Sequence, residues 1–508
     1  MKVKQQRIVA IVLGAVFVVL TVLYFTVVKP MLTETPVETE PLETVEGEAV
    51  GTNNRYLIFP QVERSSIQSV EVHNEFGSYT FYRDASDTFQ LKGYEGMQYD
   101  QELFASFVVS SGYPLAMMKI TDNATPEQMA EYGLDDPQAY WILTTTTGEV
   151  YQVNVGDILV TAGGYYVALD GRETVYILST TLADTILQPV EKMITPLLTA
   201  GMSQNDYFNA DNFMIWHGEE LYLRLTNADE SEKSNPDALV EAKMTYPAPY
   251  SPNTNLYYEV LYNFMALTGE ETVKIGPSDA DLEAYGLANP AYTISYTFED
   301  YTFYIFVSNV QADGTYYAIS NLYGYQLVAK VSAEKLGFLD YSLFKWISEY
   351  PFYAYITSVQ SMHILSGDGS VEATFNLTHG TNSEGNATLE VDAAAGDQTV
   401  HISNDDVYNF RQYYKSLLAV ELQEYTPLTE EEKEALTSDP SKLLLTFSYT
   451  TLDGEVSEYR FYQYSTRRAF VTLNGSGEFY TYVDMLEKVI SDTEKVLVGM
   501  DINSYGKK

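Results

Sequence analysis

The chain has 508 residues, and none of them is cysteine. This absence excludes disulfides, thiolate metal sites, a cysteine nucleophile and bacterial lipid attachment through cysteine. It does not identify the redox compartment, because a cysteine-free protein can fold in any of them. Histidine is also scarce, with five residues in all, which leaves few candidate ligands for a metal site.

Basic residues are few and unevenly placed. The chain holds 29 lysines and arginines against 70 aspartates and glutamates, and the N-terminal segment 1–29 has four of the basic residues and no acidic one. The rest of the chain is therefore strongly acidic and repels nucleic acid and anionic lipid headgroups, so no nucleic-acid partner is expected. Solubility in an exposed compartment explains such a surface. Binding of cations or of a basic partner is the alternative.

The common catalytic motifs are missing as well. The sequence has no G-x-S-x-G, no Walker loop and no G-x-G-x-x-G, so we do not expect ATP hydrolysis. Segments 332–335 and 342–345 match S-x-x-K without an accompanying K-T-G, which argues against a penicillin-binding enzyme. The acidic pairs 135–136 and 405–406 would suit a glycosidase only if two acids faced each other across a cleft. The pair 135–136 precedes a proline, and aspartate before proline is typical of a turn. We therefore predict no enzyme and no catalytic, cofactor-binding or metal-binding residue.

One long apolar run lies near the N-terminus. Residues 8–28 carry no charge, which is long enough for a helix that spans a bilayer. The run ends without the small-residue cleavage site of a secretory signal, so an uncleaved anchor is favoured over a cleaved signal. Basic residues precede it, and the positive-inside rule then keeps residues 1–7 in the cytoplasm and the modules outside the cell. We expect a single-pass protein of the cell membrane.

Residues 29–53 are expected to form a tether. The stretch is rich in threonine, glutamate and proline and nearly free of aromatic residues, so it buries too little apolar surface to fold. Its like charges repel one another and extend the chain. We predict a flexible acidic linker that holds the folded part away from the membrane.

The rest of the chain repeats one unit of about 150 residues three times. Three stretches share a motif that ends in proline, although the third has lost its Tyr-Gly pair. They are 131–137 (EYGLDDP), 284–290 (AYGLANP) and 434–440 (EALTSDP). An alternating strand, a turn and a second strand follow each of them. This pattern predicts tandem modules at 54–200, 201–350 and 351–500.

Each module is predicted to be an antiparallel sheet with helices packed on one side, which makes the fold class α+β. In the first module, period-two strands are expected at 67–72 and 79–82, and an amphipathic helix at 101–111. A capping box at Thr125 is expected to begin a short helix. A second capping box is predicted at Thr429 in the third module.

Histidines are the first group of side chains considered for a site. His73, His217 and His363 fall at equivalent places in the three modules, so a metal site made from them would need all three modules to converge. Shared ancestry and chance explain their positions instead. His379 and His401 lack the spacing of zinc ligands.

Tyrosines are the second group, with 44 in the chain. Strands such as 301–306 place aromatic side chains on both faces, so some of them must be exposed or covered by a partner. Core packing accounts for most of the others. The insertion 227–252, which is polar and then rich in proline and tyrosine, is predicted to be a surface loop.

This order of elements resembles the DUF4340 family. It consists of a capped short helix, the Y-G-L-x-x-P motif, a strand meander and a closing helix. The meander contains a G-Y-Y strand at 164–166 or a T-Y-Y strand at 315–317. The resemblance covers most of 54–350 and, more loosely, 351–500. It implies a bacterial protein with no established activity and transfers no catalytic residue. Family members often sit beside genes for an ABC transporter of the gliding-motility type. This implies an accessory extracytoplasmic protein whose partners are a transporter permease and auxiliary subunits.

The leading functional hypothesis is a non-enzymatic, membrane-anchored extracytoplasmic accessory or scaffold protein associated with an ABC transporter complex. The alternative is a cell-surface protein that binds cell-wall glycan or peptide through exposed tyrosines. A cell-wall hydrolase would need two essential carboxylates in one module, and the even spread of acidic residues argues against it.

Overall fold

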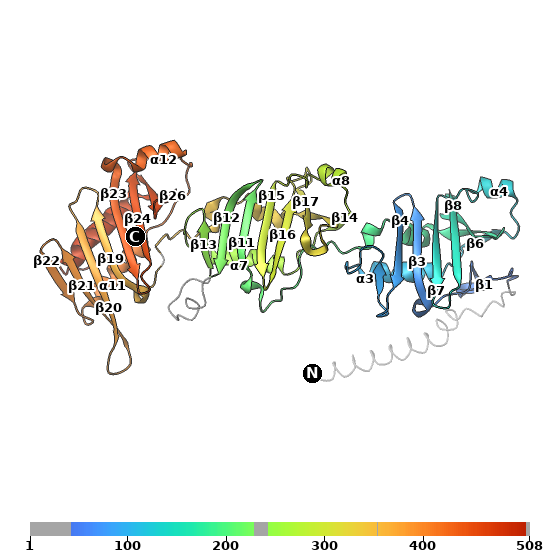
Figure 1. Ribbon diagram of the computed structural model, residues 1–508, viewed down its shortest axis with the longest axis horizontal. Coiled ribbons are helices and arrows are strands. Elements are labelled where there is room, and N and C mark those ends of the chain that lie inside the picture. The colour runs from blue at the N-terminus through green and yellow to red at the C-terminus, as the bar shows by residue number, and fades with distance from the viewer. Residues whose placement is uncertain (1–41, 228–241, 353, 504–508) are drawn as a thin grey trace, which may run out of the picture. The chain divides into compact units, whose positions relative to one another are not determined.

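The computed structural model describes residues 42–227, 242–352 and 354–503, which form an α+β protein built on antiparallel sheets (Figure 1). The fold class agrees with the prediction. The predicted membrane span at 8–28 and residues 29–41 of the predicted linker lie outside the described residues. In the part of the chain that the structure describes, no helix has both the length and the apolar composition needed to cross a bilayer.

The chain divides into two compact units. The first comprises residues up to 95 together with 100–190, and the second comprises 96–99 together with 191–508. The first unit overlaps the predicted first module, 54–200, but it also includes residues before 54 and leaves out 96–99 and 191–200. The second unit contains the other two predicted modules.

The first unit is built on an eight-stranded antiparallel sheet with the strand order β5-β4-β3-β7-β8-β9-β10-β6. Its strands are β3 (Ile67–Asn74), β4 (Gly77–Arg83), β5 (Phe89–Leu91), β6 (Met118–Thr121), β7 (Ala139–Thr145), β8 (Val150–Leu159), β9 (Gly164–Leu169) and β10 (Val175–Ser179). Its helices are α3 (Gln101–Gly112), α4 (Pro126–Glu131) and α5 (Thr180–Leu187). A separate pair, β1 (Ala49–Val50) and β2 (Tyr56–Leu57), precedes the sheet.

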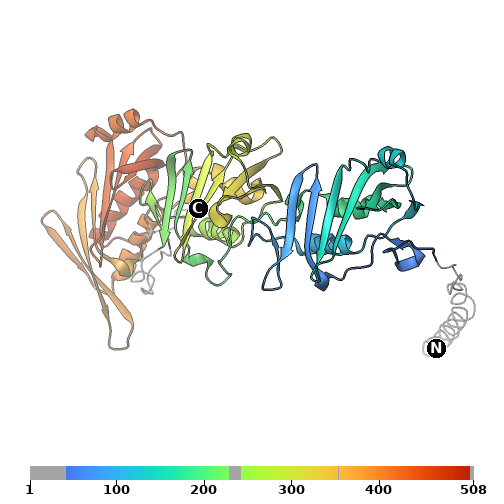
Figure 2. The ribbon, with the colours of Figure 1, turned by 45° about the vertical axis from the view of Figure 1, so that its right-hand side comes forward.

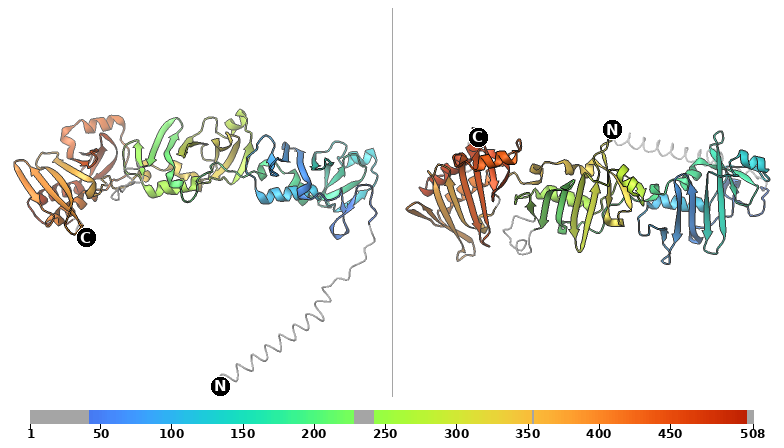
Figure 3. Two further views of the ribbon diagram at one scale, coloured as in Figure 1. Left: turned by 60° about the horizontal axis from the view of Figure 1, so that its bottom comes forward. Right: turned by 45° about the horizontal axis from the view of Figure 1, so that its top comes forward.

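Helices α3 and α5 cover one face of this sheet (Figure 3). Asp100 begins α3 by accepting hydrogen bonds from the backbone N–H groups of Glu102 and Leu103. The helix then packs the Phe104 ring 4.9 Å from that of Phe81 on β4, and both side chains are fully buried. The predicted helix is thus confirmed, but its predicted apolar side is confirmed only in part, because Phe104 and Phe107 are buried whereas Leu103 is 43% exposed.

Helix α4 covers the opposite face, which corrects the prediction that helices lie on one side only. The register of β9 and β10 puts Tyr166, Ala168 and Val175 on the face away from α3, where they form a small core with Leu134. Strand β10 is buried and mostly apolar on both faces, so both faces need cover.

The last part of the predicted linker is folded rather than flexible. Strands β1 and β2 pair with each other, and the carboxylate of Glu48, whose side chain is 0% exposed, lies 2.8 Å from the ammonium group of Lys119. The hydroxyl of Tyr176 donates a second hydrogen bond to Glu48 at 2.5 Å. These contacts attach the segment from Glu43 onward to the sheet. The prediction failed because the lysine and the tyrosine that pair with Glu48 are remote in sequence.

The second unit begins with a sheet of the same design, in the order β13-β12-β11-β15-β16-β17-β18-β14. Its strands are β11 (Asp211–His217), β12 (Glu220–Asn227), β13 (Ala242–Tyr246), β14 (Glu271–Ile275), β15 (Tyr292–Phe298), β16 (Tyr301–Val307), β17 (Thr315–Ser320) and β18 (Leu327–Ser332). Its helices are α7 (Thr254–Phe264), α8 (Asp279–Ala284), α9 (Ala333–Leu336) and α10 (Leu343–Trp346). The predicted loop at 227–252 is wrong in part, because β13 continues the sheet from β12.

The third sheet has the order β22-β21-β20-β19-β23-β24-β25-β26, which differs from the other two at both edges. Its strands are β19 (Val359–Ser366), β20 (Glu372–Thr381), β21 (Ala387–Ala395), β22 (Gln398–Ile402), β23 (Leu443–Thr451), β24 (Val456–Gln463), β25 (Arg468–Leu473) and β26 (Ser476–Tyr482). Its helices are α11 (Val407–Leu418), α12 (Glu430–Thr437) and α13 (Val483–Leu497). Figure 2 shows the β20–β21 hairpin extending beyond its neighbours. At the level of strand order, two of the three predicted modules match.

Candidate functional site

The repeated Y-G-L motif has a structural role. Tyr132 ends α4 and stacks on Tyr166 of β9 with ring centroids 4.4 Å apart. Gly133 follows in the left-handed region at φ +67°, which only glycine adopts without strain, and Leu134 is buried in the small core. The same arrangement recurs in the second sheet, where the ring of Tyr285 packs against that of Tyr317 on β17 with centroids 4.8 Å apart. The motif therefore closes a helix onto a sheet.

His73, His217 and His363 lie on β3, β11 and β19, each in a different sheet, and His379 and His401 lie on β20 and β22 of the third sheet. Nε2 of His73 lies 2.5 Å from the carboxylate of Glu71, and Nε2 of His363 lies 3.3 Å from that of Glu372. Among the described residues, His217 has no carboxylate partner of this kind. Across the described ranges, no group of three or more histidines, aspartates and glutamates is placed to hold a metal ion.

The other motifs from the sequence do not come together. Asp135 and Asp136 are exposed in the turn before Pro137. The ammonium group of Lys335 donates to the carbonyl of Thr268 and not to the serine of its S-x-x-K segment. These residues serve turns and local contacts.

The predicted aromatic strand is present as β16, and its side chains lie on both faces. Phe303 is buried in the core, while Tyr301 and Tyr304 are 45% and 42% exposed. The hydroxyl of Tyr301 donates to the carbonyl of Asn321 at 3.0 Å. The prediction of exposed tyrosines on this strand is confirmed.

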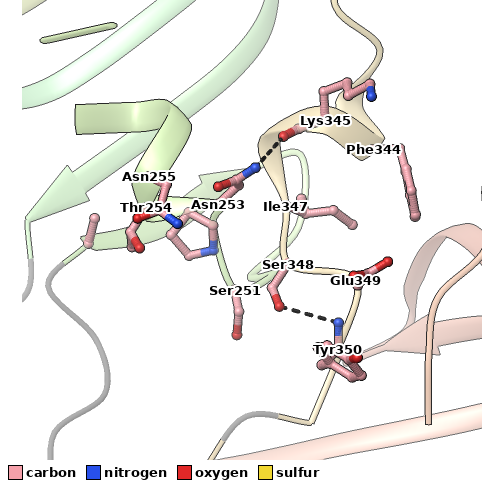
Figure 4. Close-up of a pocket in the computed structure, with 12 residues that line it drawn as sticks. Ser251, Asn253, Thr254, Asn255, Phe344, Lys345, Ile347, Ser348, Glu349 and Tyr350 are labelled. Carbon is pink, nitrogen blue, oxygen red and sulfur yellow. Dashed lines mark hydrogen bonds between the residues drawn. The ribbon is translucent and has the colours of Figure 1, made fainter. Parts of the chain in front are cut away.

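A first cavity, of about 420 Å³, lies where the segment before α7 pairs with the segment after α10 (Figure 4). Pro252 and Ile347 form a β-bridge there, and the N–H of Asn253 donates to the carbonyl of Trp346 at 2.8 Å. The Asn253 side chain accepts from the N–H of Leu256 at the start of α7. Its amide group also donates to the carbonyl of Lys345, as Figure 4 shows. Backbone pairing therefore holds this cavity in shape.

The walls of the first cavity are rich in hydroxyl and amide groups. Uncharged polar side chains on them include Ser251, Asn253, Thr254, Asn255 and Ser348, and one lysine and one glutamate, Lys345 and Glu349, line the cavity as well. The hydroxyl and amide groups donate and accept hydrogen bonds without carrying charge. This chemistry suits a hydroxyl-rich or amide-rich ligand.

A second cavity, of about 490 Å³, lies in the same unit between the β11–β12 turn and the segments around α12 and β26; we call it the junction cavity. On one side, the His217 ring stacks on Tyr222 with centroids 4.1 Å apart. The Tyr222 hydroxyl donates to the carbonyl of Tyr341 at 2.8 Å. Burial, together with the charge of Glu424, raises the pKa of Tyr222 to about 12. Nε2 of His217 is buried without a hydrogen-bond partner among the described residues.

On the other side of the junction cavity, β26 contacts α10 and the segment between β13 and α7. Phe479 packs against Tyr250 and Phe344 with centroids 5.1 Å and 5.6 Å away. The N–H of Glu478 donates to the Tyr250 hydroxyl at 3.1 Å, and burial raises the pKa of that hydroxyl. The cavity thus has a packed aromatic floor.

Four glutamates line the junction cavity, and none of its lining residues is lysine or arginine. Two of them, Glu430 and Glu478, are paired with Lys433 at 2.8 Å and 2.7 Å. The other two, Glu220 and Glu424, have no cationic partner in the described part of the chain. The cavity therefore carries negative charge that is not neutralised.

Sequence reasoning missed both cavities. The residues that form the junction cavity range from His217 to Phe479, so no local pattern joins them. The proline- and tyrosine-rich end of the insertion was the available indication, since Tyr246 and Pro247 line the junction cavity.

Comparison with known proteins gives a family match over part of the chain. Residues 90–290 match the family model described as Domain of unknown function (DUF4340). No curated protein and no solved structure matches the chain.

Proposed function

We propose that this chain, in which 90–290 is a DUF4340 match, is a non-enzymatic, membrane-anchored accessory or scaffold protein that acts outside the cytoplasm. The uncharged run at 8–28 is its single-pass anchor, and residues 1–7 stay in the cytoplasm. The basic residues before the run support this orientation. The strongly acidic composition of the rest suits an exported surface.

The proposal includes three modules of common design. Seven strands of the third sheet, β21-β20-β19-β23-β24-β25-β26, correspond in order to β5-β4-β3-β7-β8-β9-β10 of the first. Strand β22 is an addition at one edge. At the other edge, a single bridge between Gln423 and Tyr480 stands where β6 and β14 pair with the last strand of their sheets.

The observation that carries the non-enzymatic proposal is the role of the repeated residues. The recurring tyrosine, glycine and leucine cap a helix and close a core, so what the chain repeats is a packing unit. Tandem packing units present extended surfaces for binding. The exposed tyrosines and the two cavities lie on such surfaces.

The proposed partners are the permease and auxiliary subunits of an ABC transporter, as the family resemblance implies. In-cell crosslinking of the full-length chain, followed by affinity purification and mass spectrometry, tests this. We expect the permease and its ATPase to be recovered.

A matched control uses the same modules with 8–28 replaced by a cleavable secretion signal. The transporter subunits should be lost or strongly reduced with this released form, because it is no longer held at the membrane. Recovery of partners unrelated to transport from the anchored form would contradict the proposal.

The alternative is binding of cell-wall glycan or peptide, and the hydroxyl and amide groups on the walls of the first cavity favour it. Sedimentation of the purified full-length chain with peptidoglycan tests this alternative. Retention that falls in a Ser251→Ala, Thr254→Val variant but not in Ser383→Ala, an exposed serine in the β20–β21 turn, would support it. Absence of retention in the unaltered chain would remove it.

A further inference from the structure

The junction cavity combines unneutralised carboxylates with aromatic walls. Glu220 and Glu424 lack a cationic partner in the described ranges, and Tyr222, Tyr246 and Tyr425 lie on the same walls. Carboxylates pair with cations, and aromatic faces attract them through the ring quadrupole. An anionic ligand would be repelled. A neutral ligand would leave the carboxylates desolvated without a partner, which costs free energy.

One aromatic side chain on the walls of the cavity already contacts a cation of the chain itself. The guanidinium group of Arg468 lies 4.1 Å from the centroid of Tyr425, on a tyrosine that lines the cavity. Lys433 in turn bridges Glu430 and Glu478. Cations of the chain itself therefore occupy part of this surface, whereas Glu220 and Glu424 are paired with none among the described residues.

We propose that the junction cavity binds an arginine side chain presented by a basic segment of a protein partner, with lysine as the weaker ligand. A guanidinium group is planar, stacks on aromatic rings and pairs with a carboxylate through two hydrogen bonds. The surplus of acidic over basic residues in the chain attracts such a segment over longer distances. This inference rests on the proposed accessory function only for the identity of the partner.

Isothermal titration of the purified full-length chain with a capped tetra-arginine peptide tests the cavity. We expect saturable binding, weaker binding of tetra-lysine, and at least tenfold weaker binding of tetra-citrulline, the neutral isostere of arginine. Raised salt should weaken the binding of arginine, because screening reduces the attraction between charges.

Substitutions locate the binding. Glu220→Gln, Glu424→Gln in one chain should weaken tetra-arginine binding about tenfold or more, and Tyr246→Leu should weaken it about two- to fivefold. The matched control is Glu259→Gln, Glu283→Gln, which removes the same charge from exposed helix positions outside the cavity. Because Glu220 and Glu424 are exposed, their variant should unfold at the same temperature as the unaltered chain.

Equal weakening in the cavity variant and in its control would overturn the inference, since general charge would then explain binding. Citrulline binding as tightly as arginine, or no saturable binding at all, would also overturn it. These outcomes leave the accessory function standing, because the crosslinking experiment does not depend on the cavity. Loss of the transporter partners would likewise leave the titration result unaffected.

Discussion

At the scale of single residues, buried charge is placed with partners. The side chain of Asp492 is 1% exposed and lies between Lys488 and Lys495 on its own helix, α13. The hydroxyl of Ser416 on α11 donates to the same carboxylate at 2.8 Å. This cluster joins the two helices that pack on one face of the third sheet.

Removing this carboxylate is expected to be costly. Asp492→Ala removes the hydrogen bonds of the buried carboxylate to two partly exposed lysines and to Ser416, and such a loss destabilises a fold by about 1–3 kcal/mol. Faster hydrogen exchange in α11 and α13 would report it. Glu487→Gln, at an exposed position on the same helix, is the control and should exchange like the unaltered chain.

Lowering the pH should remove the stability that the Asp492 carboxylate contributes to the fold. Burial raises the pKa of Asp492, but hydrogen bonds from Lys488, Lys495 and Ser416 outweigh it and leave the pKa below its usual value. When the pKa of a carboxyl group is lower in the folded state than in the unfolded state, the group stabilises the fold at any pH above its unfolded-state pKa. This stabilisation is lost as the pH falls toward the folded-state pKa. The difference in urea midpoint between the unaltered chain and Asp492→Asn should therefore be constant above about pH 5 and shrink below about pH 4. An unchanged difference at low pH would contradict this account.

The glycines of the Y-G-L motif differ in the space around them. Gly133 and Gly286 have φ of +67° and +69°, but an added Cβ would lie 3.0 Å from Asp157 at the first and 3.6 Å from Ser308 at the second. Gly286→Ala should cost about 1 kcal/mol from backbone strain, and Gly133→Ala should cost more. Tryptophan fluorescence can follow each unit, since Trp141 lies in the first and Trp216 and Trp346 lie in the second.

The control for this comparison is Gly286→Asn. Asparagine tolerates the left-handed region better than alanine. It should therefore recover part of the lost stability at this position. Equal costs for alanine and asparagine would mean that strain is not the cause.

At the scale of elements, three short helices begin with the same kind of N-terminal capping box. Thr125, Ser278 and Thr429 each accept from the backbone N–H three residues ahead, and the side chain at that position bonds back to the cap in each case. The capping boxes at Thr125 and Thr429 were predictable because they depend only on residues three apart.

Removal of a cap should loosen the helix that it begins. Thr125→Ala leaves an N–H of α4 unsatisfied and should cost the first unit about 1 kcal/mol. The Trp141 signal should then unfold at lower urea concentration, while the tryptophans of the second unit keep their midpoint. Thr125→Ser retains the hydroxyl and is the control. A shift in both units would point to an effect beyond the cap.

The limits of prediction at this scale are set by distance along the chain. Strands β3, β4, β7 and β8 pair with near neighbours through short turns, and their alternation is visible in the sequence. Strand β6 pairs instead with β10, across more than fifty residues, and its own pattern is weak. The burial of Glu48 depends on Lys119 and Tyr176, which are more remote still. Such features follow from tertiary packing and have no local mark.

At the scale of the whole molecule, the composition makes topology directly testable. Because the chain has no cysteine, any cysteine introduced by substitution is the only thiol. Ser476→Cys, at an exposed position, should react on intact cells with a maleimide that does not cross membranes, and Gln5→Cys should react only after permeabilisation. The reverse labelling pattern would contradict the proposed orientation.

The junction cavity is also a feature of the whole molecule, and the sequence alone did not predict it. The acidic surplus suggested a basic partner or cations but no place for them. The place exists because Glu220 at the start of β12 and Glu424 in the segment between α11 and α12 line one cavity. Composition therefore indicated the charge of the proposed ligand, and only the fold supplied a position for it.

The pairing of β1 with β2 has a mechanical consequence if residues 8–28 are held in a membrane. Tension on the anchor would enter the first unit at Glu48 and pull β1 away from β2 from the open end of their hairpin, where Ala49 faces Leu57. A hairpin loaded in this way separates one bond at a time and resists little force. The ion pair between Glu48 and Lys119 lies just ahead of that end, so it would take the strain first and act as a latch between the anchor and the folded unit.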